Sequence, residues 1–164
     1  MDDRKAYLRH CEDDLYVSGI GVVVMGVWSV MKVLMTFMVN YKEFFDPEAE
    51  DQKFEIIAVA VIYALVAVLL ILILKVHLYI GLNAIKAAKG GKYKKGYLPW
   101  TVILLVLTIA SLATYYDSFQ DLNNIDTTIA SFLVDLTTIY IFTIVITSTL
   151  KIKKFKQTQV MEAT

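Results

Sequence analysis

Residues 56–74, IIAVAVIYALVAVLLILIL, decide the fold class of this 164-residue chain. The stretch contains no charged side chain. As an α-helix it would be about 28 Å long, close to the ~30 Å hydrocarbon core of a bilayer. A soluble helix of this length would carry a polar face, and a strand of a membrane barrel would alternate polar and apolar residues. The stretch does neither, which predicts a transmembrane helix.

Three further stretches have a similar length and character. Together with 54–74, the ranges 18–40, 98–116 and 127–150 make four predicted spans, and 57% of the chain is apolar. The first span follows 17 residues rich in charge, and no A-x-A cleavage site comes after it, so we expect a retained anchor and not a signal peptide. The sequence therefore predicts an all-α integral membrane protein, folded as a single four-helix transmembrane bundle over residues 1–164.

The distribution of Lys and Arg predicts the orientation of the bundle. Twelve of the 16 Lys and Arg residues lie in 1–17, 86–95 or 151–164. Positive residues are retained in the cytoplasm, so we expect both termini to be cytoplasmic, in the plasma membrane. Short connections favour antiparallel neighbours and an up-down-up-down order. The expected order is a cytoplasmic segment 1–17, span 18–40, outer loop 41–53, span 54–74 with a helical extension to about 89, basic cytoplasmic turn 90–97, span 98–116, outer loop 117–126, span 127–150 and cytoplasmic tail 151–164. The first span is likewise a candidate to extend backwards as a helix through DDRKAYLRHCEDDLY, with Asp2 or Asp3 as its cap.

Glycines and aromatic residues lie at positions that support this order of spans and loops. Gly90 and Gly91 are expected to end the extension of the second helix. Small residues let helices approach closely in a membrane, and we expect those of the first span to pack within the bundle. These small residues are Gly19, Gly21 and Gly26. Aromatic residues at the span ends are expected at the membrane interfaces, with Tyr16, Tyr79, Tyr97 and Trp100 on the inner side and Tyr41, Phe44, Tyr115 and Tyr116 on the outer side.

Two ionisable residues, Lys32 and Asp135, interrupt the apolar spans. Lys32 lies 14 residues from Ser18, and Asp135 lies 15 residues from Leu150. Both are then about 21–22 Å above the inner face, at the same depth. A charge facing lipid near a helix centre costs ~2.5–3.5 kcal/mol, so we expect the two to pair inside the bundle. The pair would fix helix packing or handle an ion or proton; in a third alternative, Lys32 snorkels outward or meets a lipid phosphate.

A polar layer is expected around this pair. Its predicted members lie at a similar depth in the membrane to the pair, or on the same helical stripe. Trp28 lies one turn before Lys32 and would cover the ammonium or its aliphatic stem. The members are Trp28, Tyr63, Ser111, Thr114, Ser131 and Thr138, with Thr128 on the stripe of Asp135.

The basic turn AIKAAKGGKYKKGYL, residues 84–98, has two interpretations. Its lysines set the orientation of the chain, or they also contact anionic lipid headgroups, which attract cytoplasmic lysines near the membrane surface. Zero net charge and interface aromatics argue against a nucleic-acid partner. The lysines concerned are Lys86, Lys89, Lys92, Lys94 and Lys95.

The other candidate sites are poor in ligands or motifs. The acidic residues of the first outer loop match no calcium-binding loop and are expected to be solvated. Cys11 is the only cysteine, and with His10 and His77 it offers too few ligands for a zinc site. No metal or cofactor is therefore expected. The acidic residues are Glu43, Asp46, Glu48, Glu50 and Asp51, together with Glu55 just after the loop.

These features predict a membrane protein without catalytic activity. No nucleophile, phosphate-binding or dinucleotide motif occurs in the sequence. About half of the chain is predicted span, and the loops are too short for a soluble domain. We expect an interaction or accessory component whose partners are the bilayer and itself or another membrane protein. The alternatives are an oligomeric channel or transporter that uses Lys32 and Asp135 in an ion or proton path, and an intramembrane enzyme that has only this pair as support.

Overall fold

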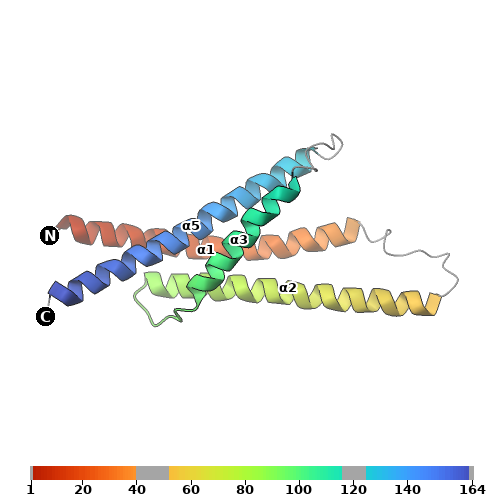
Figure 1. The fold of residues 1–164 in the computed structure, drawn as a ribbon, viewed down its shortest axis with the longest axis horizontal. Helices are drawn as coiled ribbons and strands as arrows, with labels where there is room; N and C mark the ends of the chain where they lie inside the picture. The colour runs from red at the N-terminus through yellow and green to blue at the C-terminus, as the bar shows by residue number, and fades with distance from the viewer. Residues whose placement is uncertain (1, 40–51, 116–124, 163–164) are drawn as a thin grey trace.

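The chain is all-helical in the computed structural model, which describes residues 2–39, 52–115 and 125–162 (Figure 1). Four of its helices are long and apolar enough to cross a membrane, as the hydropathy of the sequence predicts. The acidic residues from Glu43 to Asp51 lie outside the described residues, as does Tyr116, and nothing is described of the Glu55 side chain. The helical elements are α1 (Asp2–Val39), α2 (Gln52–Ala88), α3 (Tyr97–Ser111), the short 3-10 turn η2 (Leu112–Thr114) and α5 (Ile125–Glu162).

Two helices are longer than the apolar stretches from which they were predicted. Helix α1 begins at Asp2, along the backward extension considered for the first span, and α5 continues to Glu162, beyond the Leu150 at which the fourth span was expected to end. Neither extension contains glycine or proline. Each also has an apolar stripe that packs on the other helices, with Leu8, Cys11 and Leu15 on α1 and Ile152 on α5. Burial of these stripes explains why the helices continue.

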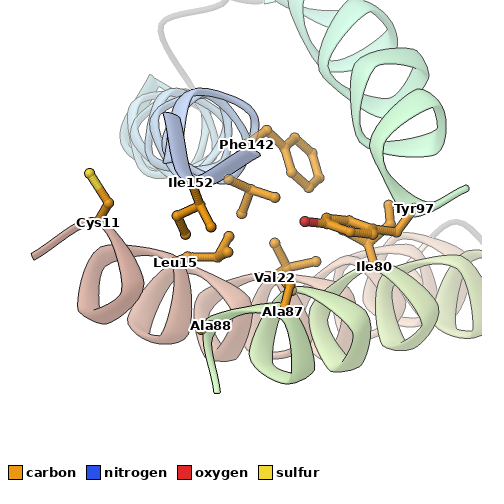
Figure 2. Close-up of a cluster of buried hydrophobic side chains, with 11 residues drawn as sticks. Cys11, Leu15, Val22, Ile80, Ala87, Ala88, Tyr97, Phe142 and Ile152 are labelled. Carbon is orange, nitrogen blue, oxygen red and sulfur yellow. The ribbon is translucent and has the colours of Figure 1, made fainter. Parts of the chain in front are cut away.

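The helices meet in the half of the molecule that holds both chain termini, and the first turns of α1 and the last turns of α5 project beyond this region (Figure 1). Helix α1 packs along α2, α3 packs along α5, and α1 also contacts α5. Towards the opposite end the two pairs diverge (Figure 1). The buried apolar cluster lies where the pairs meet, and all four long helices contribute to it (Figure 2). Its members are Cys11, Leu15, Val22, Ile80, Ala84, Ala87, Ala88, Tyr97, Phe142, Val145 and Ile152.

Helices α1 and α2 approach each other closely at glycines. A Cβ atom added to Gly81 would lie 2.6 Å from the Gly19 carbonyl oxygen and 2.6 Å from Val23 Cγ2. One added to Gly26 would collide with the Cβ of His77 on α2. Only residues without a side chain allow this backbone approach, so the glycines determine how near the two helices lie.

The turn after α2 is closed by backbone and side-chain hydrogen bonds. Gly90 has a φ of +69°, which glycine adopts at little cost, and it ends the helix. The N–H of Gly91 donates to the carbonyl of Lys86 at 2.9 Å, and that of Gly90 donates to Ala87 at 3.2 Å, the pattern of a Schellman motif. The Asn83 side chain then accepts a hydrogen bond from the N–H of Lys94 at 2.9 Å. These bonds return the chain towards α3.

Substitution Gly81→Ala is expected to lower the free energy of unfolding by about 1–3 kcal/mol, the usual cost of overpacking. The added methyl would meet the backbone of α1, which moves only if the helices separate. Equilibrium unfolding of the purified protein in mixed micelles measures the effect.

Gly21→Ala is the matched control, because its nearest neighbour would be Cδ1 of Ile141, at 3.0 Å, the flexible end of a side chain. Equal losses in the two variants would contradict a close backbone contact at Gly81.

Candidate functional site

Lys32, Tyr115 and Asp135 form a hydrogen-bonded network that connects three helical segments. The Lys32 ammonium on α1 donates to the Tyr115 hydroxyl at 3.0 Å. That hydroxyl donates to Asp135 Oδ2 on α5 at 2.6 Å. Lys32 Nζ also lies 3.7 Å from the same carboxylate oxygen, which makes a direct ion pair. The tyrosine therefore bridges the two charges while they remain in contact with each other.

The position of Tyr115 follows from the end of the third span. Tyr115 comes directly after η2, and the residue is 8% exposed. Its ring meets the ring of Phe132 on α5 edge to face, with centroids 5.7 Å apart and an interplanar angle of 83°. Lys32 Nζ lies 5.6 Å from the centroid of the Tyr115 ring, within the range of a cation–π contact. Packing on Phe132 thus directs the hydroxyl towards both charges.

The network is asymmetric in its exposure. The Asp135 side chain is 19% exposed, whereas that of Lys32 is 41% exposed. The carboxylate is therefore the more enclosed charge, and it receives both the tyrosine hydrogen bond and the attraction of the ammonium. Hydrogen bonds with a charged partner contribute about 1.5–3 kcal/mol. Chemically, the arrangement neutralises two charges and contains a hydroxyl able to accept a proton from one side and donate one to the other.

The network lies towards the end of the molecule where the helix pairs diverge. Tyr115 follows Thr114, the last residue of the third candidate span. Lys32 lies near the end of the first candidate span, Lys5–Met35, and Asp135 near the start of the fourth, Thr128–Thr158. The long lysine side chain thus connects α1 to the α3–α5 pair on the side away from the termini (Figure 1).

The residues of the expected polar layer have several different surroundings. The hydroxyls of Ser111, Thr114 and Thr138 each donate to a carbonyl of the preceding turn, at 2.7, 2.6 and 2.9 Å. Trp28 and Tyr63 are exposed side chains. Lys32 Nζ lies over the ring of Tyr115, which was expected only as an interface aromatic. Ser131 is half-buried and Thr128 is buried.

Tyr115 is the network residue that sequence reasoning missed. Its position at the end of a span had indicated only an interface aromatic. The predicted depth in the membrane could have identified it. Tyr115 lies at the outer end of the third span, which is at nearly the same distance above the inner face as Lys32. Which way the hydroxyl turns depends on the packing of α3 on α5, which is not encoded in hydropathy.

The lysines of the basic turn are all exposed and lie at the end of the molecule that holds the termini (Figure 1). Lys89 Nζ lies 5.0 Å from the centroid of the Tyr16 ring, and Lys151 Nζ lies 5.7 Å from that of Tyr7. These contacts connect the turn and the extension of α5 to α1. The other lysines of the turn are Lys86, Lys92, Lys94 and Lys95.

The candidate ligands His10, Cys11 and His77 have other surroundings. His10 lies 3.6 Å from Asp14 on the surface of α1, and Cys11 is a free cysteine in the buried cluster. His77 is buried, and its Nδ1 lies 2.9 Å from the Ile73 carbonyl, which accepts the hydrogen bond. Within 2–39, 52–115 and 125–162, no group of three or more His, Cys, Asp or Glu side chains is placed to hold a metal ion.

Comparison with known proteins finds no matching family model, no matching curated protein and no matching solved structure. The function of the chain is therefore inferred from its own side chains. The Lys32–Tyr115–Asp135 network is its most distinctive polar feature within the apolar helices.

Lys32→Leu alone is expected to lower the free energy of unfolding by about 1.5–3 kcal/mol, because the enclosed Asp135 loses the ammonium. The double variant Lys32→Leu with Asp135→Leu is expected to recover much of this loss, since no unpaired charge remains. Unfolding in mixed micelles measures all four corners of the cycle. A double variant no more stable than the worse single variant would show that the two residues are not energetic partners.

Tyr115→Phe tests whether the Tyr115 hydroxyl contributes to the stability of the network. It removes the hydroxyl and keeps the ring that packs on Phe132. We expect Tyr115→Phe to lower the free energy of unfolding by more in the wild-type chain than in the Asp135→Leu variant, where the hydroxyl has already lost the carboxylate. Equal effects in both backgrounds would place the stabilising role of Tyr115 in its ring and not in its hydroxyl.

Proposed function

We propose that the chain is a four-span integral membrane protein, arranged up-down-up-down in the plasma membrane, which acts as a non-catalytic interaction or accessory component. The observation that carries the proposal is the outward apolar surface of the helices. In the four candidate spans, only 6% to 22% of the residues in the most apolar windows are buried inside the chain. Apolar surface on this scale is covered in a native protein by lipid or by a partner.

The charges support an orientation with both termini in the cytoplasm. The extension of α5, the basic turn and the first turns of α1 lie at the same end of the molecule (Figure 1). These segments hold most of the lysines and arginines. Retention of positive residues on the cytoplasmic side favours the orientation in which this end faces the cell interior.

The amino-terminal half of α2 supports an interaction role in particular. Within 60–69, each residue except the half-buried Val66 is exposed, and Leu70, which follows them, is buried. Most of the buried residues of α2 lie further along, from His77 to Ala88. In this orientation, an apolar helix segment with so little cover from its own chain would cross the outer half of the bilayer. It offers a surface for a helix of another membrane protein or of a second copy.

A photo-crosslinking residue at Val68, an exposed position of this segment, is expected to yield a discrete protein adduct in native membranes. The matched control is Leu107 on α3, which has a similar exposure and lies on a helix that packs along α5. The mass of the adduct distinguishes a second copy from another protein. No adduct at Val68, or the same adduct from both positions, would contradict an interaction through α2.

A channel or transporter is the second candidate, and the Lys32–Tyr115–Asp135 network favours it. An ammonium, a hydroxyl and a carboxylate in direct contact within apolar helices resemble the relays through which protons move. Four spans rarely enclose a path in a single copy, so this function requires an oligomer.

Ion or proton flux into liposomes separates the two candidates. The interaction role predicts that wild type and Asp135→Asn are equally inert across common ions. The transport role predicts flux in the wild type, and loss of that flux when the carboxylate is replaced by an amide of nearly the same shape. Measured flux that depends on Asp135 would overturn the non-catalytic interaction role as the main function.

A further inference from the structure

A pocket of about 790 Å³ lies between the basic turn and the extension of α5, at the end of the molecule that holds the termini. Its volume is typical of sites for small organic ligands. One wall comes from the turn and the start of α3, with Tyr93, Lys95 and Leu98. The other comes from α5, with Ile152, Lys153 and Lys156. Cations and apolar side chains thus line the same pocket.

The positive charges of the pocket converge from two segments that are far apart in sequence. Lys153 and Lys156 are one helical turn apart and share a face of α5, while Lys95 faces them from the turn. Among the described residues that line the pocket, none is acidic. Within the described part of the chain, these three lysines form no ion pair or hydrogen bond through their side chains. Their charges are therefore available to an anionic ligand.

The walls of the pocket are held together independently of any ligand. The Tyr97 hydroxyl and Thr149 Oγ1, which are buried, lie 2.7 Å apart and join the start of α3 to α5. The rings of Tyr93 and Tyr97 meet edge to face with centroids 5.9 Å apart. Helix α3 starts at Tyr97, so the positive end of its dipole also lies at the pocket. A preformed, positively charged cavity loses little conformational entropy when it binds a ligand.

The apolar part of the lining and the place of the pocket favour a lipid over a soluble anion. Leu98 belongs to the first turn of the third candidate span, and Trp100 beside it is an exposed aromatic of the kind found at headgroup level. In the proposed orientation, the pocket therefore opens where phosphates and the first acyl carbons lie on the cytoplasmic side. The lysines suit the phosphate, while Leu98 and Ile152 suit the glycerol and acyl portion.

We propose that this pocket binds the phosphate-bearing headgroup of an anionic membrane phospholipid, an inference that rests on the proposed membrane placement. Basic pockets between transmembrane helices on the cytoplasmic side are known to bind such headgroups. The site differs from the anionic-lipid contact expected from the sequence. It uses Lys95 of the basic turn, together with Lys153 and Lys156, which the sequence had assigned to orientation only.

The test compares two double variants in nanodiscs of phosphatidylcholine that contain increasing amounts of phosphatidylglycerol. Lys95→Gln with Lys156→Gln removes one charge from each wall of the pocket. Lys92→Gln with Lys154→Gln is the matched control, since it also removes one charge from the turn and one from α5, at exposed residues outside the lining. Native mass spectrometry counts the phosphatidylglycerol molecules that stay bound to each protein.

We expect the pocket variant to bind phosphatidylglycerol about 30-fold more weakly than the wild type, and the control to stay within about threefold. Equal weakening in both variants would overturn the proposal, because it would show attraction to the whole basic surface. The proposal would also be overturned if the wild type retained phosphatidylcholine and phosphatidylglycerol equally.

Two further arms separate the sources of failure. Glycerol 3-phosphate added at a large excess should displace little lipid; complete displacement would assign the pocket to a soluble phosphate and overturn the lipid. Failure of the protein to enter nanodiscs would overturn the membrane placement itself, and the lipid site with it. Incorporation without discrimination between the two lipids would overturn the lipid site alone.

Discussion

The packing of all four long helices around Val22, Ile80, Phe142 and Val145 is the contact on which the other features depend (Figure 2). It joins the α1–α2 pair to the α3–α5 pair at one end of the molecule. Glycines bring α1 close to α2, and the Tyr97–Thr149 hydrogen bond joins α3 to α5. Because the apolar cluster is confined to this end, the helices are free to diverge at the other.

Both candidate sites follow from this geometry. Where the pairs diverge, the long side chain of Lys32 on α1 reaches both Tyr115 and Asp135. At the opposite end, convergence brings the turn after α2 against the extension of α5, and the lysines of both segments surround one pocket. One site thus holds a balanced pair of charges, and the other holds an excess of positive charge.

The two sites place different demands on their surroundings. The Lys32–Asp135 pair contains its own counter-charge, so it needs only partial shielding from lipid, which Tyr115 and Phe132 provide. The pocket lysines have no acidic neighbour among the described residues that line the pocket, so an anion must come from outside the chain. The charges of the first arrangement balance within the chain, whereas those of the second suit the binding of an external anion.

The features that depend on local composition could be read from the sequence. Apolar stretches long enough to span a bilayer predicted four helices, and Gly90 predicted the end of α2, because glycine tolerates the positive φ that closes a helix. Lys32 and Asp135 have the same predicted depth in the membrane, which indicated that they are neighbours. In the structure their charged atoms lie 3.7 Å apart. The depth of a residue in the membrane follows from its position along a single helix and does not depend on how the helices pack.

Only the tertiary structure decided how the helices face one another. The insertion of the Tyr115 hydroxyl between the two charges depends on the rotation of α3 against α5, and the pocket depends on where α5 continues past the basic turn. Hydropathy is nearly uniform around these helices, so it carries little information on rotation or crossing. Steric fit at a few small and aromatic residues, such as Gly81 and Phe132, determines how the helices rotate and cross. This fit exists only when the helices are packed together.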